Sequence, residues 1–214
     1  GGMVRYAAKR GVKSLGVTLS KEQAEWGQAK IKEEGLEDLA EIRFMDYRDV
    51  TEEGFDAISA IGLLEHIGVK NYPDFFSFLH GKLKPGGLML NHCITYPDNH
   101  KTPKGGFIDR YIFPDGELSG SGTITKCMQD AGFEVVHTES LRFDYMRTLH
   151  DWCENLKETW EEACSLVGLP TARLWAIYMA GSEWGFEHNI INLYHFLGVK
   201  LGDAGSRAGV PERR

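Results

Sequence analysis

Several residue types that can do chemistry stand directly after apolar stretches of this sequence. Glu65 and His66 follow two leucines at the end of the stretch 59–64. Burying a carboxylate without a partner is costly, so a glutamate in this position usually has a partner or a task. Asp46 and His92 each follow a further apolar stretch. Carboxylate and imidazole groups gathered in one place could bind a ligand, orient an anion or move a proton.

The elements that would position these residues alternate between strand and helix. Short apolar runs bounded by turn residues predict strands, and Ser20 followed by Gln23 predicts a helix start with a capping box. This alternation is typical of a doubly wound, Rossmann-like α/β sheet. The expected strands are 12–20, 40–50, 55–62 and 88–95, and the expected helices are 3–10, 21–35 and 70–83.

The polar residues share a position relative to the expected strands. In a doubly wound sheet, ligands lie beyond the carboxyl ends of the strands. We therefore expect four groups to open onto one crevice. These groups are Thr18 to Gln23, Asp46 with Tyr47, Gly62 to Glu65, and His92.

The pattern changes after the strand at 88–95. We expect one domain over residues 1–200, in which 95–185 is a loop-rich and helical insertion that covers the site as a lid. Residues 201–214 are rich in glycine and charge and are expected to be a loose tail. Within and after the insertion we expect a strand at 134–143, long helices at 144–168 and 171–190, and a closing strand at 191–201.

Composition narrows the classes of function. The 214 residues carry a formal net charge of −7, which argues against general nucleic-acid binding. No apolar run approaches the roughly 20 residues that span a bilayer. The four cysteines match no zinc spacing, so we expect free thiols in a reducing cytoplasm and no metal.

Seven motifs together resemble one enzyme family. They are "GVTLSKEQ", "DYRDV", "SAIGLLEHIG", "LKPGG", "NHCI", "YIFPDGEL" and "DYMRTLHDW". Their order is similar to that in the cyclopropane fatty acid synthases, which use S-adenosylmethionine to modify lipid acyl chains. The resemblance implies, as the first interpretation, methylene transfer across the cis double bond of an unsaturated phospholipid acyl chain to form a cyclopropane ring. It also implies peripheral contact with the inner face of the membrane from the cytoplasm, and it leaves the oligomeric state open.

The resemblance assigns two sets of site residues. A bound bicarbonate ion would deprotonate the carbocation that follows methyl transfer, and its ligands would be Gly62, Glu65, His92, Ile94 and Tyr145, of which Glu65, His92 and Tyr145 would be catalytic. Contacts to S-adenosylmethionine would come from Gly1, Gly2, Thr18, Leu19, Ser20, Gln23, Asp46, Tyr47, Arg48 and Ile61.

Each assignment has a structural alternative. Ser20 and Gln23 would also fit a helix cap alone. Asp46 would fit a turn, and Glu65 would fit a structural carboxylate at a helix N-terminus. His92 and Tyr145 would fit hydrogen-bonded core side chains. His66 is interpreted as structural.

Departures from the family pattern leave the function open at several points. Only Gly1 and Gly2 match the family's cofactor loop, so the chain looks like a C-terminal piece that could bind the cofactor weakly or be inactive. Ser182 stands where some family members have a cysteine. A methyl- or methylene-branched product is as compatible with these residues as a cyclopropane. A small-molecule N-methyltransferase is the less favoured enzyme class, because it has no need for donors around an anion.

Overall fold

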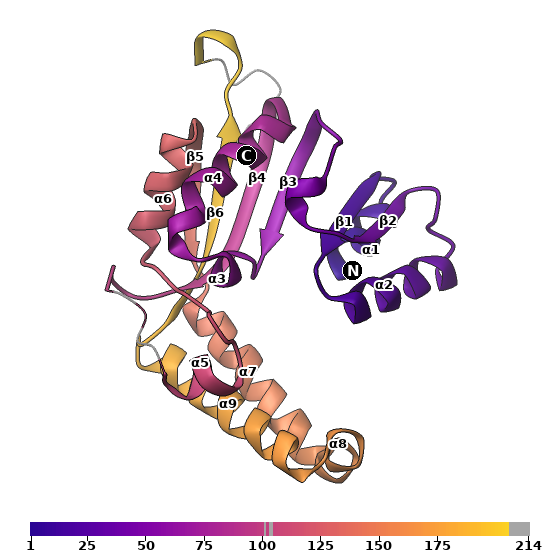
Figure 1. The fold of residues 1–214 in the computed structure, drawn as a ribbon, viewed down its shortest axis with the longest axis vertical. Coiled ribbons are helices and arrows are strands. Elements are labelled where there is room, and N and C mark those ends of the chain that lie inside the picture. Colours follow the sequence, from indigo (N-terminus) through magenta and orange to yellow (C-terminus); the bar gives the residue numbers. More distant parts are fainter. Residues whose placement is uncertain (101, 103–104, 206–214) are drawn as a thin grey trace. The chain divides into compact units, whose positions relative to one another are not determined.

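The computed structural model describes residues 1–100, 102 and 105–205. The chain divides into two compact units, Gly1–Glu52 and Glu53–Arg214. The first, here called the N-terminal unit, is built on one pair of parallel strands (Figure 1). Its elements are α1 (Gly2–Ala8), β1 (Ser14–Thr18), α2 (Lys21–Glu33), β2 (Ala40–Phe44) and the 3-10 turn η1 (Tyr47–Asp49).

Small and branched apolar side chains hold the N-terminal unit together. Both helices contribute to this core, and β2 contributes the rest. Gly16 on β1 allows close packing, because a Cβ atom there would lie 2.8 Å from Val4 Cγ2. The buried core residues are Ala8, Ala24, Ile31, Ala40 and Ile42.

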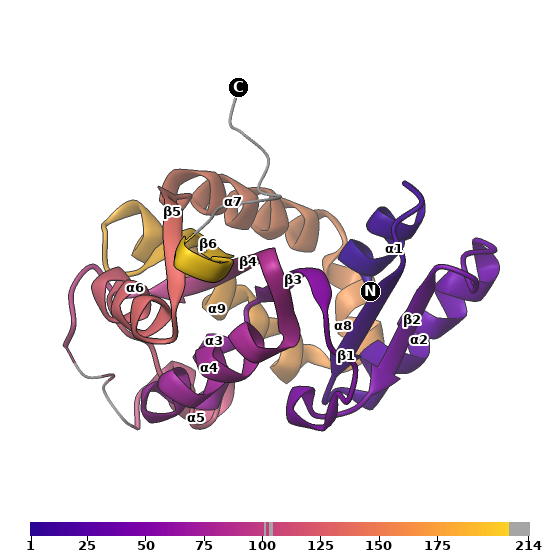
Figure 2. The same ribbon diagram turned by 90° about the horizontal axis from the view of Figure 1, so that it is seen from above.

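The second unit, here called the C-terminal unit, is built on a four-stranded sheet of order β3-β4-β6-β5. The pair β3–β4 is parallel, and β6 is antiparallel to both of its neighbours. Figure 2 shows α4 and α6 on one side of this sheet and α7 on the other. Its strands are β3 (Phe55–Ile61), β4 (Leu83–Thr95), β5 (Phe133–Ser140) and β6 (Asn192–Lys200). Its helices are α3 (Leu64–Ile67), α4 (Tyr72–Lys82), α5 (Phe107–Tyr111), α6 (Ser121–Asp130), α7 (Arg142–Glu158), α8 (Trp160–Val167) and α9 (Leu169–Glu187), with 3-10 turns η2 (Val69–Asn71) and η3 (Asp203–Gly205).

The predicted α/β class is confirmed, but the described strands form two sheets and not one. Strand β3 is an edge strand of the four-stranded sheet. It was expected to be buried, yet only Ala60 in it is buried and Ile61 is 53% exposed.

Two further boundaries differ from those expected. The predicted helix 144–168 breaks at Thr159, which separates α7 from α8. Thr159 Oγ1 donates to the carbonyl oxygen of Asn155 at 2.8 Å, and such bonds to the preceding turn weaken a helix. Strand β4 begins at Leu83, five residues before the expected start at residue 88, and its pairing with β3 shifts register between Phe55 and Ala57. Strand β5 lies inside the range 95–185, so part of the predicted insertion belongs to the sheet.

Three other features bear on the expectations. All four cysteines are free, as predicted. Among the described residues, no helix combines the length and apolarity needed to cross a bilayer. Most of the predicted tail, residues 206–214, lies outside the described residues.

Candidate functional site

Glu65 lies at the start of α3, directly after the turn that ends β3. Gly62 makes this turn with φ 64°, and its N–H donates to the carbonyl oxygen of His92 at 2.8 Å. The register of β3 with β4 ends at the pair Ile61–His92. Beyond that pair, the N–H of Ile94 donates to Glu65 Oε1 at 2.7 Å. The carboxylate therefore takes the place that another strand residue would occupy beside β4.

The second oxygen of this carboxylate has no partner. Among the described residues, Glu65 Oε2 is buried and accepts no hydrogen bond. Burial raises the pKa of Glu65, and the bond from Ile94 N–H offsets part of that rise. Four side-chain atoms among the described residues are buried without a partner: Glu65 Oε2, Asn91 Oδ1, Thr95 Oγ1 and Ser119 Oγ. Only Oε2 belongs to an ionisable carboxylate, for which burial without a donor is most unfavourable, so we take it as the strongest indication of a ligand in this unit.

Tyr145 of α7 lies in the electrostatic field of Glu65. Burial, and then the charge of Glu65, raises the pKa of the Tyr145 phenol. Its ring packs edge-on against Phe186 at a centroid distance of 5.1 Å, beside the cluster formed by Leu149, Phe186 and Leu193. The Tyr145 phenol thus has an apolar surround and lies within range of the Glu65 charge, and its predicted role at an anion stays a prediction.

Tyr178 of α9 is a further residue on which the charge of Glu65 acts, and it was not predicted from the sequence. Burial raises its pKa first, and the charges of Tyr145 and Glu65 add to the rise. Its ring packs edge-on against Phe113 at 5.7 Å. Tyr178 also bonds Ser182, one helical turn later. The sequence could have indicated Tyr178, because it lies four residues before Ser182 on a predicted helix and Ser182 is one of the departures from the family pattern.

The "YIFPDGEL" and "EHIG" motifs are in contact. The N–H of Glu117 donates to the carbonyl oxygen of Glu65 at 2.9 Å. Phe113 packs edge-on against His66 at a centroid distance of 5.5 Å. His66 is exposed and makes this ring contact, which agrees with its interpretation as structural.

His92 is linked to Glu65 through β4, and the structure gives it a different partner. His92 and Ile94 alternate with buried Cys93, so their side chains share the sheet face on which Tyr145 packs. His92 Nδ1 lies 2.7 Å from Nε2 of His195. Burial, and then the nearby His195, lowers the pKa of His92. Sequence reasoning did not find His195.

The N–H of Ile94 was expected to donate to a bound anion. In the structure it donates to Glu65, so an anion there would share or displace that hydrogen bond. The remaining predicted anion ligand, Gly62, uses its N–H in the turn to His92. The donors still to be assigned to an anion are therefore the side chains of His92 and Tyr145.

The predicted cofactor residues Thr18, Ser20 and Gln23 form one hydrogen-bonded group in the N-terminal unit. Ser20 caps α2, and its Oγ accepts from the N–H of Gln23 at 3.2 Å. The second half of the expected capping box is wrong. The N–H of Ser20 donates to Thr18 Oγ1 at 3.1 Å, and Gln23 Oε1 also lies 3.3 Å from that hydroxyl.

Asp46 is already occupied by Arg48. Its carboxylate caps η1 by accepting from the N–H of Arg48 at 2.9 Å, and it also binds the Arg48 guanidinium at 2.9 and 2.7 Å. These bonds lower the pKa of Asp46. The turn-aspartate alternative therefore describes the geometry, and a ligand amine would compete with Arg48 for the same oxygens.

The remaining cofactor candidates lie apart along the chain. Gly1 is the N-cap of α1 and Gly2 its first residue, and Leu19 is 70% exposed. Ile61 ends β3 in the C-terminal unit. The single crevice expected from the sequence would need both units, so it stays a prediction.

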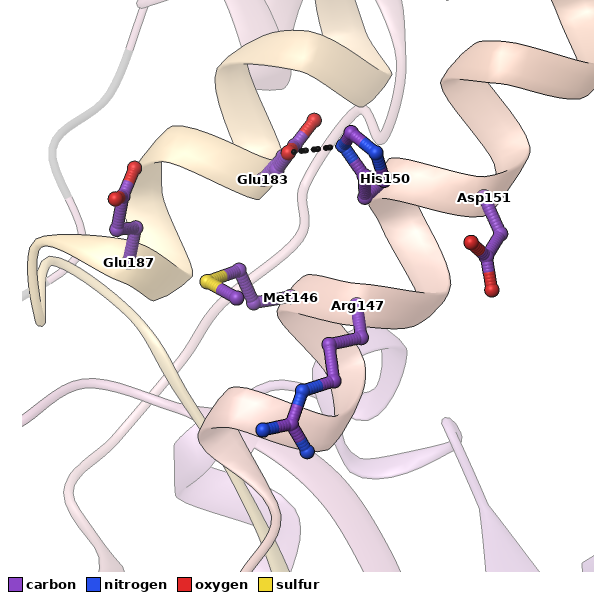
Figure 3. A pocket seen from close by; sticks show the side chains of 6 residues that line it. All are labelled: Met146, Arg147, His150, Asp151, Glu183 and Glu187. Atoms are coloured by element: carbon purple, nitrogen blue, oxygen red, sulfur yellow. Dashed lines mark hydrogen bonds and ion pairs between the residues drawn. The ribbon is translucent and has the colours of Figure 1, made fainter.

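Two surface pockets lie beside α7 and α9. Figure 3 shows one of about 380 Å³, where His150 Nδ1 points toward Glu183 Oε1 at 3.0 Å. Its lining residues are Met146, Arg147, His150, Asp151, Glu183 and Glu187. The other, about 360 Å³, is mostly apolar and includes Trp160 and Met179. Neither is lined by Glu65, His92 or Tyr145, and the described residues hold no metal-binding cluster.

Comparison with known proteins gives consistent matches. Residues 1–196 match the family model described as mycolic acid cyclopropane synthetase. A probable fatty acid methyltransferase of Mycobacterium tuberculosis, Rv3720, is 59% identical over 206 residues, covering 96% of this chain and 48% of its own. A probable fatty acid methyltransferase of Pseudomonas putida is 42% identical, with 94% and 52% covered. The chain thus spans about half the length of these curated relatives.

A solved structure supports the same relationship. The mycolic acid cyclopropane synthase CmaA1, complexed with SAH and CTAB, superposes with a TM-score of 0.81. It is 28% identical, and the match covers 92% of this chain and 73% of that one. The fold and the sequence comparison therefore point to the same family.

Proposed function

Because this chain belongs to the mycolic acid cyclopropane synthetase family of S-adenosylmethionine-dependent methyltransferases, we propose that it takes part in methyl transfer to the double bond of an unsaturated fatty acyl chain. The observation that carries this proposal is the carboxylate of Glu65, whose buried Oε2 has no partner among the described residues and whose charge acts on Tyr145. The names of the relatives from M. tuberculosis and P. putida favour a fatty acid methyltransferase over the cyclopropane synthase that the motifs suggested first.

The N-terminal unit fits a polar cosubstrate. Thr18, Ser20 and Gln23 place hydroxyl and amide groups at the end of β1, where hydroxyl groups of a ribose could bond. S-adenosylmethionine, when bound, supplies a methyl group that an alkene can attack. The exchange of the Ser20 cap for a ligand contact would cost about 1 kcal/mol, because the cap satisfies one backbone N–H only.

The C-terminal unit fits an anion that carries a hydroxyl group. Glu65 Oε2 is a hydrogen-bond acceptor without a donor among the described residues, and bicarbonate has one O–H to donate. Bicarbonate, when bound, would supply the base for the last proton transfer. Glu65 would orient it, and the side chains of His92 and Tyr145 would donate to its oxygens. Donors fixed in a largely water-free site stabilise such charge strongly.

The fate of the carbocation would decide the product. An alkene has no proton to lose before it attacks a methyl group, so deprotonation must follow the transfer. Loss of a proton from the new methyl group, with closure of the ring, gives a cyclopropane. Loss that forms a new double bond gives a methylene branch, and its conversion into a methyl branch would be a separate reduction by an external hydride donor. We favour a branched product because of the relatives' names, and the cyclopropane is the second candidate.

Peripheral membrane contact belongs to the proposal, because the acyl chains of phospholipids lie in a bilayer. Leu166, Val167 and Leu169 are 76%, 52% and 43% exposed where α8 turns into α9. Aliphatic side chains of this kind insert into the interface of a membrane. We propose that this turn meets the inner face of the membrane. Flotation with phosphatidylglycerol vesicles should weaken for Leu166→Ser, and the matched change of exposed Ile190→Ser should leave it unaltered.

The test of the function is product analysis. The protein is incubated with labelled S-adenosylmethionine and vesicles of an unsaturated phospholipid, and the fatty acids are released for mass spectrometry. A labelled branch or ring at the former double bond is expected. Mild hydrogenation separates the products, because a methylene branch takes up hydrogen and a cyclopropane resists it. Label in the headgroup alone would contradict the proposal.

The alternative is that these residues act as an inactive fragment. It is favoured by one observation, that the chain spans about half of its relatives. Calorimetry with S-adenosylhomocysteine distinguishes the two. Micromolar binding supports a working cofactor site, and absence of binding supports the fragment.

A further inference from the structure

His92 and His195 form a cross-strand pair in the centre of the four-stranded sheet. They are register partners on β4 and β6, so their side chains leave the sheet on the same face. The separation of 2.7 Å between His92 Nδ1 and His195 Nε2 is a short hydrogen bond. The rings are tilted by 53° with centroids 4.8 Å apart, which excludes a stacked contact.

This bond restricts the protons on both rings. One of the two nitrogens must carry a hydrogen and the other must present a lone pair, so two fully protonated rings cannot form it. Burial and the neighbouring imidazole lower the pKa of His92, which favours its neutral form with a single N–H. The outer nitrogen of His92, Nε2, is then a donor only if Nδ1 is the acceptor in the pair.

We propose that His195 is a positioning residue, whose Nε2–H donates to His92 Nδ1 and holds His92 as the neutral ring with its proton on Nε2. In this state the outer edge of His92 offers an N–H to an anion. With the bond reversed, the outer edge would offer a lone pair and would repel the anion. The inference rests on the proposed function only in naming an anion as the group that His92 meets.

Of the neighbours of His92, only His195 is placed to decide which ring nitrogen of His92 carries the proton. On the other side of β6, the register partner of His195 is Glu139, whose carboxylate lies 3.4 Å from Nε2 of His137. On the other side of β4, His92 is the register partner of Ile61, which has no titratable group. Among the side-chain contacts that His92 makes with the described residues, the hydrogen bond to His195 is the one that can fix its protons.

The test reads the tautomer directly. Nitrogen-15 NMR of histidine-labelled protein at neutral pH, with His92 assigned by comparison with His92→Gln, separates protonated from bare ring nitrogens. We expect a protonated Nε2 and a bare Nδ1 on His92. In His195→Leu the two tautomers should mix, and His195→Gln should restore the single tautomer because its amide can donate. The matched control His137→Gln should leave the spectrum of His92 unchanged.

Two spectral outcomes would overturn the inference. One is a protonated Nδ1 on His92 in the wild type, and the other is an unaltered His92 in a folded His195→Leu variant. In the transfer assay, His195→Leu should lower turnover about 10-fold, the effect of one lost hydrogen bond of roughly 1.4 kcal/mol. His195→Gln should recover most of this loss. A wild type without transferase activity but with the expected tautomer would reject the proposed function and leave the role of His195 standing.

Discussion

The two units of this chain differ in what stabilises them and in what chemistry they carry. The N-terminal unit has one pair of strands and five buried core residues, three of which are alanines. The C-terminal unit has four strands and a core that includes the fully buried rings of Phe76 and Phe196. The costly feature, the buried carboxylate of Glu65, is found in the unit with the larger core. The polar residues of the N-terminal unit stay near solvent and bond one another.

This difference follows from how much apolar surface each unit can bury. Two strands with a small core are marginally stable on their own, whereas a sheet with helices on both faces can hold an unfavourable buried charge. Surface ion pairs add to the N-terminal unit, as where Glu34 bonds both Arg5 and Lys9. Such pairs contribute little each, so the N-terminal unit should respond more sharply to small losses.

The largest expected effect is in the C-terminal core. Phe196→Ala removes a ring with 0% exposure from the central strand β6 and should cost about 3–5 kcal/mol of unfolding free energy. Urea unfolding followed by circular dichroism measures it. The control Phe143→Ala deletes a ring that is 51% exposed and should cost about 0.5 kcal/mol or less. Equal losses would mean that the sheet does not depend on this core.

The second prediction tests the stability of the N-terminal unit. Ile42→Ala empties part of the small N-terminal core and should cost about 2–5 kcal/mol, which is large for a unit of this size. Hydrogen exchange read by mass spectrometry should show fast exchange within residues 1–52 and native protection in β4 and β6. Loss of protection in both units together would show that they unfold as one.

The smallest expected effect is the loss of stability of the N-terminal unit at acidic pH. Bonds from Arg5, and then from Lys9, lower the pKa of Glu34 from 4.5 to about 2. Since the folded pKa lies below the unfolded value, this stabilisation is complete above about pH 4.5 and is lost as the pH falls toward 2. Hydrogen exchange of α1 and α2 should therefore accelerate across that window. Glu34→Gln should remove this part of the pH dependence, and an unchanged profile in the variant would contradict the assignment.

The features that could be predicted from sequence are the local ones. The cap at Ser20 depends on residues three positions apart, and the alternation of strands and helices depends on short apolar runs. The exposure of β3 could not be predicted, because an apolar run has the same sequence pattern in an edge strand as in a central strand. The partners of the site residues were missed for a similar reason. His195 reaches His92 across 103 residues, and Tyr178 comes within range of the charges of Tyr145 and Glu65 only through the packing of α9 on α7.

The central claim is that Glu65 serves the reaction and not the fold. The direct test is turnover of S-adenosylmethionine on vesicles of an unsaturated phospholipid, measured for Glu65→Gln beside the exposed control Glu53→Gln. Glu65→Gln should lower turnover about 100-fold or more while the affinity for S-adenosylhomocysteine stays unchanged, because the carboxylate would act after methyl transfer. Glu53→Gln should keep the wild-type rate. A wild-type rate for Glu65→Gln would contradict the account and return this residue to a structural role.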